Sequence, residues 1–435
     1  MKFGALLGLV LSVSSALAQD VNKAGPTTIT LSDIQAAQLL ILNNRLDDAK
    51  RVVEHVLATR PDDTEGQFLL ANIAVAEKDY DTAISLFRRI LVREPATERV
   101  RLELARAFFL KGDYDNADRQ FRFARAGDID DTVKANVDHF LSAINRLREW
   151  TVNFSFALAP DTNQNAATSA SQVSIFGLPF ALDKGARKQS GIGLAGDIGG
   201  EWSPLLGDTV KARIGADLTR VEYSGGAFDD MTVSAYGGPQ FLFANWDVSI
   251  LATGFKRWFA NQDYVSGAGG KLAADYGIAS NWVVGASVGG QAVTNAFIPQ
   301  QSGPLWSVQT QAAYVLSPSS LFQLQLGFNR QDAQIAPYSY SSVWFGGGYS
   351  QDLPWGFSAG FQPSYFITRY DAMLAAFGKT RSDDAVMLAF TLLNRRFDYH
   401  GFTPRFSYVF TEQHSNIALY SFTRNQFQIG LTSLF

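Results

Sequence analysis

The sequence predicts a multidomain α + β chain, an N-terminal α-solenoid of helical repeats followed by an antiparallel transmembrane β-barrel of about 14 strands. Three observations lead to this prediction: a 34-residue repeat in the first part, a fall in charge density, and alternation of apolar and polar residues in the second part. Residues 19–150 carry 41 charged side chains in 132 positions, whereas residues 151–435 carry 36 in 285. Two domains of different physical class therefore meet near residue 150.

Residues 1–18 have the features of a secretory signal peptide. Lys2 precedes an apolar stretch from Phe3 to Val13, and Ala16 and Ala18 are the small residues that a signal peptidase requires. The stretch is too short to span a bilayer, so we expect cleavage after Ala18 and export of the mature chain. The sequence contains no cysteine, which excludes disulfides, thiolate metal sites and a lipid anchor on cysteine.

Residues 19–149 are predicted to form the repeat domain. The segments "RLDDAK" at 45–50, "DYDTAI" at 79–84 and "DYDNAD" at 113–118 lie 34 residues apart, which resembles the tetratricopeptide repeat, a stack of antiparallel helix pairs. A last helix, from about Asp131 to Leu147, breaks the pattern and is expected to cap the stack. Small and apolar residues share the spacing: Ala37, Ala71 and Ala105; Ala49, Ala83 and Ala117; Val53, Phe87 and Phe121.

Solenoids of this kind bind extended chains or helices in a groove lined by the first helix of each pair. The resemblance places the groove positions, where we expect such a protein chain to bind, at Gln38, Phe68, Asn72, Arg106 and Phe109. The alternative is that the repeats pack on the neighbouring domain and bind no transient partner, because a repeat architecture carries no chemistry of its own.

Residues 150–435 are predicted to form the barrel. Alternation by itself fits a soluble sandwich as well as a membrane barrel. The linkers decide between them, because those after even-numbered strands are mostly tight and those after odd-numbered strands are generally longer, as in bacterial outer-membrane barrels. The predicted strands span residues 151–159, 190–202, 209–223, 231–243, 248–259, 265–279, 282–295, 305–317, 321–333, 338–351, 356–370, 383–393, 403–412 and 424–435.

The two faces of these strands predict a lipid-facing wall and a polar lumen. Leu324 and Leu326 are expected to face lipid. Tryptophan favours the bilayer interface, and five of the eight tryptophans fall at the predicted periplasmic rim: Trp150, Trp202, Trp246, Trp282 and Trp355. The opposite parity assigns the lumen to Asp197, Glu201, Lys211, Arg213, Asp217, Gln323 and Gln325.

The last strand is expected to close the barrel against the first, because an unpaired edge in lipid would leave backbone amides unsatisfied. Its sequence, "NQFQIGLTSLF" at 425–435, ends in an aromatic residue after alternating apolar positions. This resembles the signal that the barrel-assembly machinery recognises, although Ser433 departs from the usual apolar position. We therefore expect that machinery and outer-membrane lipids as partners.

The whole arrangement resembles the surface lipoprotein assembly modifiers, the outer-membrane component of type XI secretion. The most specific local likeness is "ALAPDTNQNAAT" at 157–168, because members of that family carry a similar string of Asp, Asn, Asn and Ala. The resemblance implies a translocator in the outer membrane of a Gram-negative bacterium that exports or displays a client, either a surface lipoprotein or a secreted protein, with its repeats in the periplasm. Two alternatives remain: an exopolysaccharide export barrel, and a passive porin in which the repeats are only an anchor.

No catalytic residue, cofactor or metal site is predicted. Asp161, Asn163 and Asn165 are spaced like the start of a calcium loop, but the glycine and closing glutamate of such a loop are missing. Charges are nearly balanced in both parts, and the net charge of −4 indicates no nucleic acid partner. The four histidines lie far apart without partners at metal-ligand spacing: His55, His139, His400 and His414.

Overall fold

The computed structural model describes residues 32–243, 245–279, 281–397 and 402–433. The predicted signal peptide, His400 and the last two residues of the predicted closing strand lie outside these residues. The chain divides into two compact units, residues 1–69 and residues 70–435, and each is described by itself.

The first unit contains the helix pair α1 (Asp33–Leu42) and α2 (Leu46–Thr59) and the start of α3 (Thr64–Ala76). Helix α1 begins with a capping box, in which Ser32 Oγ accepts from the Gln35 backbone N–H and Gln35 Oε1 accepts from the Ser32 N–H. Ala37 and Ala49 are fully buried in this unit.

Four further helices precede the barrel in the second unit. The aspartates at the start of "DYDTAI" and "DYDNAD" are N-caps: Asp79 accepts from the Thr82 N–H and Asp113 from the Asn116 N–H. This explains why these two copies begin with aspartate, whereas Arg45, at the same position of the first copy, makes no side-chain cap. None of the helices in the described part of the chain is long and apolar enough to cross a membrane. The helices are α4 (Tyr80–Arg93), α5 (Glu98–Lys111), α6 (Tyr114–Arg125) and α7 (Asp131–Leu147).

The registered positions of the repeat are core positions. All six alanines that share the 34-residue spacing have 0% exposure, and Val53, Phe87 and Phe121 are also buried. Small residues let the paired helices approach closely, and the larger ones fill the space between pairs. The α-solenoid prediction is confirmed.

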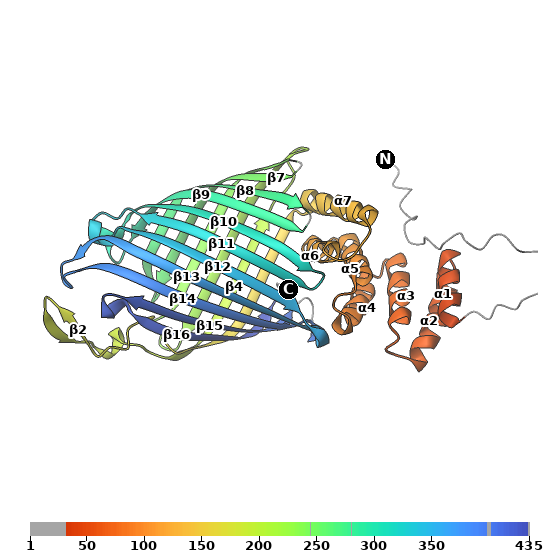
Figure 1. Cartoon of the computed structure of the whole chain (residues 1–435), viewed down its shortest axis with the longest axis horizontal. Helices are drawn as coiled ribbons and strands as arrows, with labels where there is room; N and C mark the ends of the chain where they lie inside the picture. The colour runs from red at the N-terminus through yellow and green to blue at the C-terminus, as the bar shows by residue number, and fades with distance from the viewer. Residues whose placement is uncertain (1–31, 244, 280, 398–401, 434–435) are drawn as a thin grey trace, which may run out of the picture. The chain divides into compact units, whose positions relative to one another are not determined.

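The described residues also form a closed barrel of fourteen antiparallel strands, in which β16 pairs with β1 (Figure 1). Neighbouring barrel strands are consecutive in the chain except that β1 is followed by β4, because a separate hairpin of β2 and β3 lies between them. The strands are β1 (Trp150–Asp161), β2 (Gln172–Ile175), β3 (Leu178–Ala181), β4 (Gly191–Trp202), β5 (Val210–Tyr223), β6 (Asp230–Leu242), β7 (Trp246–Phe259), β8 (Gln262–Ala279), β9 (Trp282–Asn295), β10 (Gly303–Ser317), β11 (Ser320–Gln331), β12 (Tyr340–Asp352), β13 (Phe357–Leu374), β14 (Lys379–Asn394), β15 (Thr403–Ser415) and β16 (Phe422–Thr432).

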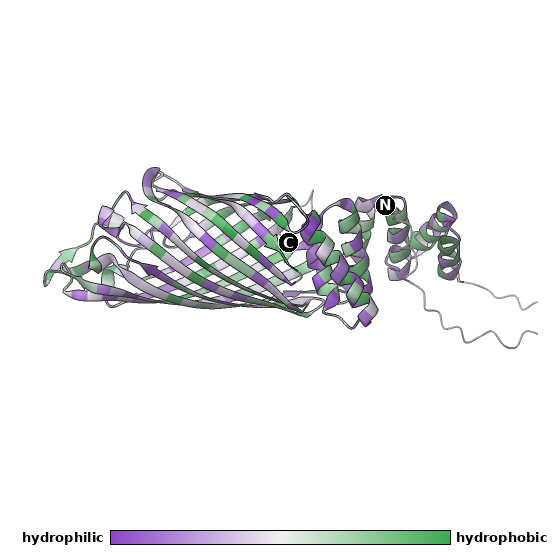
Figure 2. Ribbon diagram, turned by 90° about the horizontal axis from the view of Figure 1, so that it is seen from above, coloured by the Kyte–Doolittle hydropathy of each residue, from purple (hydrophilic) through white to green (hydrophobic). Residues whose placement is uncertain are grey.

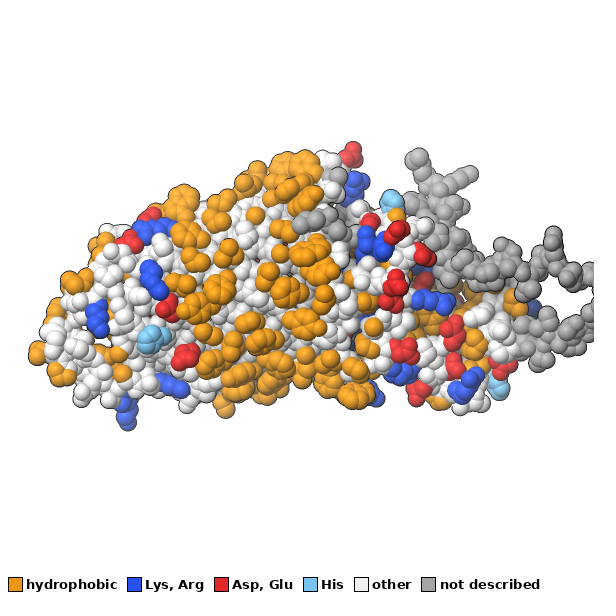
Figure 3. All heavy atoms as spheres, in the orientation of Figure 1, with side chains coloured by type: hydrophobic (Ala, Val, Ile, Leu, Met, Phe, Trp, Pro, Cys, Tyr) orange, Lys and Arg blue, Asp and Glu red, His pale blue; other side chains and the backbone are white. Residues whose placement is uncertain are grey.

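The outer wall of the barrel is an apolar belt. Hydrophobic and hydrophilic residues alternate along the strands (Figure 2), and the outer surface in Figure 3 is covered with hydrophobic side chains, with charges gathered towards the ends of the barrel. Leu324 and Leu326 are both about half exposed on this surface, at 50% and 51%. A closed barrel with such a belt is an outer-membrane protein, and its short-turn end, where the repeats are attached, faces the periplasm.

Aromatic pairs mark the periplasmic end of this belt. The rings of Trp150 and Trp202 stack 5.9 Å apart on the paired strands β1 and β4. Trp246 packs on Tyr276 and Trp282 packs on Tyr314, with both centroid distances at 4.5 Å. Two tyrosines thus complete the girdle that the tryptophans predict.

The asymmetry of the connections holds only in part. On the side predicted to have tight turns, the β4–β5 and β14–β15 connections are longer, the second being the segment "NRRFDYHGFT" that also stands out in the sequence. On the side predicted to have long loops, β7 and β8 are joined by only Ala260 and Asn261, which adopt φ values of 51° and 59°. Two successive positive φ angles are the geometry of a tight type I′ hairpin. The longest connection, from β1 to β4, contains the β2–β3 hairpin, which the sequence analysis did not predict.

Candidate functional site

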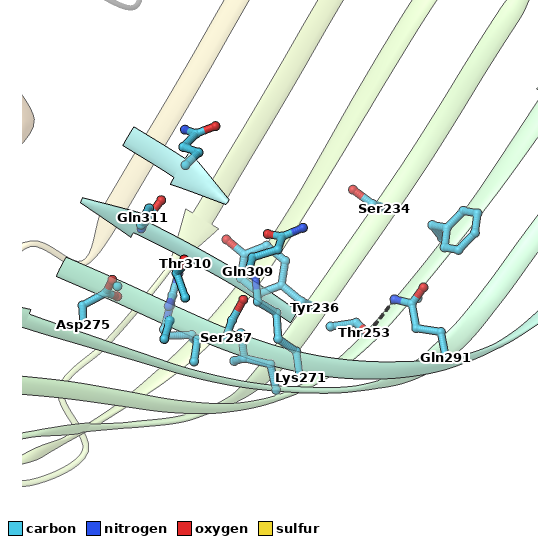
Figure 4. Close-up of a pocket in the computed structure, with 18 of the residues that line it drawn as sticks. Ser234, Tyr236, Thr253, Lys271, Asp275, Ser287, Gln291, Gln309, Thr310 and Gln311 are labelled. Carbon is cyan, nitrogen blue, oxygen red and sulfur yellow. Dashed lines mark hydrogen bonds between the residues drawn. The ribbon is translucent and has the colours of Figure 1, made fainter. Parts of the chain in front are cut away.

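The barrel encloses a cavity of about 610 Å³. Polar side chains from β6 to β10 line it, and Figure 4 labels ten of them. Gln291 Nε2 on β9 donates to Thr253 Oγ1 on β7 at 2.9 Å, across the intervening strand. The main polar and charged residues of the lining are Arg213, Ser234, Tyr236, Lys271, Asp275, Ser287, Gln291, Gln309, Gln311 and Gln325.

A charged cluster crosses three neighbouring strands of the inner wall. Arg213 on β5 donates to Glu201 on β4 through Nε at 3.1 Å and through a terminal nitrogen at 2.6 Å. Tyr236 on β6 donates its hydroxyl hydrogen to the same carboxylate at 2.6 Å. Such charge-assisted bonds hold these side chains in one arrangement. Two predicted lumen residues, Glu201 and Arg213, are thus brought together.

Asp197 and Asp217 also lie on the inner face. Asn153 Nδ2 on β1 donates to Asp197 Oδ1 at 2.9 Å. A Cβ at Gly199 would lie 2.3 Å from Asp217 Oδ1 and 2.4 Å from Asn153 Oδ1. Glycine at this position therefore leaves room for the polar side chains around it.

Gln325 lines the cavity, and Gln323, on the same strand face, packs near Gly348. Lys211 differs from the other predicted lumen residues because only 2% of it is exposed. Its Nζ donates to two backbone carbonyls at the end of α7, those of Asn145 at 2.9 Å and Arg148 at 2.6 Å. Lys211 therefore caps a helix C-terminus and does not present its charge to open lumen space.

The predicted groove residues have unequal access to solvent. Phe68 is buried, and the ring of Phe109 packs on Tyr114 and Phe140. Gln38 is half-buried and donates to Glu65 at 3.1 Å. In the second unit, Asn72 is half-buried, and Arg106 is exposed and forms an ion pair with Glu103 at 2.9 Å. Asn72 and Arg106 therefore present polar surface.

Helices α5 and α7 are held to the barrel at two separate places. Asn145 on α7 donates to Asp247 on β7 at 3.1 Å, beside the Lys211 contact on β5. Arg101 on α5 donates to Asp352 on β12 at 3.0 Å. In the closed order of the described strands, β5 and β12 are seven positions apart in either direction. These helices therefore extend between opposite sides of the periplasmic rim, which no pattern in the sequence predicts.

The junction of the first and last strands, called the seam below, is paired over a shorter length than its neighbour. β1 pairs with β4 from Trp150 to Asp161, but with β16 only from Ser155 to Asp161. At its periplasmic end, the backbone N–H of Phe154 donates to Ser433 Oγ at 2.9 Å. The hydroxyl of Ser433, at the position that departs from the apolar pattern, thus extends the seam by one residue.

The "ALAPDTNQNAAT" segment fastens the other end of the seam. Asp161 Oδ2 accepts from Arg424 Nε at 2.9 Å and from the Tyr223 hydroxyl at 3.1 Å. Asn163 is fully buried, and its Nδ2 donates to the Thr423 carbonyl at 3.1 Å. Farther along the same loop, the Phe176 N–H donates to the carbonyl of Ala376, in the β13–β14 connection, at 2.7 Å. The segment is therefore a structural clamp between strands and loops that are distant in the sequence.

A family model described as surface lipoprotein assembly modifier matches residues 150–435, the entire barrel. The chain belongs to the surface lipoprotein assembly modifier family. A tetratricopeptide repeat model also matches residues 34–98 and 79–127.

Relatives in this family match most of the chain at low identity. The surface lipoprotein assembly modifier of Moraxella catarrhalis is 23% identical over 98% of this chain and 86% of its own. That of Pasteurella multocida is 20% identical over 97% of this chain and 87% of its own. Among solved structures, the outer membrane channel DcaP of Acinetobacter baumannii is similar over 65% of this chain and 97% of its own. The sequence identity is 8% and the TM-score is 0.39, which supports no argument about function.

Proposed function

We propose that this protein carries a surface lipoprotein client across the outer membrane, with the barrel as the route and the periplasmic repeats as the part that engages the client. The observation that carries the proposal is the match of the surface lipoprotein assembly modifier model to every strand of the barrel, residues 150–435. The names of the relatives that span nearly the whole chain support the same role.

The inside of the barrel suits a polypeptide in transit. The cavity of about 610 Å³ is lined mainly by amides, hydroxyls and a few charges of both signs. Such groups can exchange hydrogen bonds with a passing backbone without selecting one sequence. Outer-membrane lipids and the barrel-assembly machinery remain predicted partners for the wall and for insertion.

We place client engagement at Asn72 and Arg106, which are equivalent positions one repeat apart. Arg106 offers a guanidinium to acidic groups of a client, and the amide of Asn72 can donate to and accept from its backbone. The experiment is surface display of a candidate client lipoprotein in a deletion strain complemented with Asn72→Ala/Arg106→Ala. Display is expected to fall severalfold at normal barrel abundance.

Arg51→Ala is the matched control, because Arg51 is an exposed arginine of α2 and is not a predicted groove position. Substitutions at such exposed sites change stability by roughly 0.5 kcal/mol or less, so the barrel should accumulate normally in all strains. Normal display with the double variant would move client engagement away from the groove. Normal display in the deletion strain itself would contradict the export role.

The two alternatives predict different phenotypes in the same deletion strain. Loss of an exopolysaccharide exporter would remove surface polysaccharide and leave lipoprotein display intact. Loss of a passive porin would lower small-solute uptake only. Family membership favours the lipoprotein route over both.

A further inference from the structure

The backbone ladder of the seam lacks a donor at Pro160. Just after β1, the Thr162 N–H donates to the Asn425 carbonyl, and on β1 the Phe154 carbonyl accepts from the Ser433 N–H, both at 3.0 Å. Even-numbered residues of β1 therefore direct their backbone groups to β16, and Pro160 is an even-numbered residue without an N–H. The registered pairs of β1 and β16 are interrupted at this position.

Prolines interrupt two other pairs of neighbouring strands, Pro239 between β6 and β7 and Pro363 between β12 and β13. In both of those pairs a turn joins the two strands, and several registered residues follow on each side of the proline. No turn joins β1 to β16, and Asp161–Gln426 is the one registered pair beyond Pro160. Among the described strands, the seam is therefore the pair that is held together least.

The side chains in the middle of the seam provide no polar fastening from β1. Residues 156–160 have the sequence "FALAP", and none of these side chains can form a hydrogen bond or an ion pair. On the opposite strand, Gln428 Oε1 accepts from Arg405 on β15 at 2.9 Å. The polar side-chain contacts of Ser433 and Asp161 described above lie at the two ends of the seam. Its middle is held by backbone bonds and apolar contact.

This middle part separates membrane lipid from the polar interior of the barrel. On its inner face the two strands approach so closely that a Cβ at Gly430 would lie 2.7 Å from the Cβ of Ala157. Its outer face carries four apolar side chains that are about half exposed in the wall: Phe156, Leu158, Ile429 and Leu431. Separation of β1 from β16 would thus open the lumen directly to the hydrocarbon layer.

We propose that β1 and β16 separate between Phe154 and Pro160 during export, and that acyl chains of the client extend through this opening into the membrane. Both statements rest on the function proposed above, in which the client is a surface lipoprotein. Acyl chains anchor a protein by burying CH₂ groups in the hydrocarbon layer, whereas the lumen is lined mainly by amides, hydroxyls and charges. A lateral opening lets the acyl chains remain in lipid while the polypeptide that carries them crosses in the polar lumen. The Asp161–Arg424 pair keeps the outer end of the seam aligned for closure.

A disulfide across the seam tests whether the two strands must separate. Ser155 and Thr432 are registered partners of β1 and β16, and the chain has no cysteine of its own. Ser155→Cys/Thr432→Cys therefore allows a single disulfide in the oxidising periplasm. The matched control is Ser342→Cys/Thr368→Cys, because Ser342 and Thr368 are registered partners in the proline-interrupted pair β12–β13, with hydroxyl oxygens 3.0 Å apart.

The measurement is surface display of a candidate client lipoprotein in the deletion strain carrying each variant, with and without a reductant. Non-reducing gels report the disulfide, and heat-modifiable mobility reports the folded barrel. The seam disulfide is expected to lower display severalfold and the reductant to restore it, while the control disulfide leaves display at the wild-type level. Normal display with a complete seam disulfide, or equal loss with both disulfides, overturns the proposal. Display that does not depend on the wild-type gene contradicts the export function instead, so the two failures are distinguishable.

Pro160→Val tests the same opening without a covalent lock. Valine supplies an N–H that can donate to the carbonyl of Phe427, which lies opposite in the register, so the seam should become harder to open. Display should fall, and the urea concentration that unfolds the barrel should rise. Pro363→Val, which adds the equivalent donor between β12 and β13, should leave display unchanged. Unchanged display by a stabilised Pro160→Val barrel, or an equal fall with both variants, contradicts opening at the seam.

Discussion

Arg424 on the last strand donates two hydrogen bonds to Asp161 on the first strand, from Nε at 2.9 Å and from a terminal nitrogen at 2.6 Å. The carboxylate is buried, with 1% of its side chain exposed, whereas 23% of the arginine side chain is exposed. The pair fastens the end of the seam opposite to the repeats, where Asp161 is also the last residue of β1 in register with β16.

Arg424→Ala is expected to destabilise the folded barrel by about 3 to 5 kcal/mol, because it leaves the Asp161 carboxylate buried without its cation. The measurement is the urea concentration at which half of the protein has lost the gel mobility of the folded, heat-modifiable barrel. Arg220→Ala is the control, since Arg220 and Glu222 form a more exposed ion pair, of a kind that contributes about 0 to 1 kcal/mol. Equal midpoints for the two variants would mean that the seam does not depend on this pair.

Strand parity predicts opposite tolerance of charge on β11. Leu324→Arg or Leu326→Arg places a cation in the lipid-facing wall, which destabilises the folded barrel by roughly 2 to 4 kcal/mol near the bilayer midplane. Gln323→Arg or Gln325→Arg places the cation in the polar interior and should be far less disruptive. Folded fraction on unheated gels reports the difference. Similar damage from both parities would be incompatible with the observed strand faces.

The topology predicts that the β2–β3 hairpin lies outside the cell and the repeats inside the periplasm. Because the chain has no cysteine, single cysteines can be labelled cleanly. A membrane-impermeant maleimide should label Leu178→Cys, at an exposed hairpin position, on intact cells. Arg51→Cys in α2 should react only after the outer membrane is permeabilised. Labelling of Arg51→Cys on intact cells would reverse the orientation.

Lys211→Met should loosen α7 from the rim, because the carbonyls of Asn145 and Arg148 lose the donor that they share. Leaving a buried polar group without its hydrogen bond destabilises a protein by about 1 to 3 kcal/mol. Limited trypsin digestion of the purified protein should then cut faster at Arg146 and Arg148. Lys271→Met, in the main cavity, is the control and should leave this cleavage unchanged. An unaltered rate in Lys211→Met would show that other contacts hold the helix.

Periodic features of the fold could be predicted from the sequence. The 34-residue spacing identifies alanines that prove fully buried, and alternation places Leu324 and Gln325 on opposite faces. These patterns are visible because a stacked repeat and a barrel wall each place successive residues in recurring environments. The β2–β3 hairpin has no such pattern, since it lies outside the wall, and it was missed.

The contacts that define the candidate site could not be predicted in the same way. Arg101 and Asp352 are 251 positions apart, and Asp161 and Arg424 are 263 apart. No local rule pairs residues across such distances, because their meeting depends on how the barrel closes and where the helices attach. The unusual composition of "ALAPDTNQNAAT" marked the segment as specific, but its role as a clamp required the position of β16.

The connection between the repeats and the barrel is very short, since α7 ends at Leu147 and β1 begins at Trp150. Arg148 and Glu149 leave little slack, and the Arg148 carbonyl is already held by Lys211. A mechanical load on α7 therefore passes into β1, which is also one side of the seam, as well as into β5 and β7 through Lys211 and Asp247. Traction on the periplasmic helices is in this way transmitted to the strand whose pairing completes the circumference of the barrel.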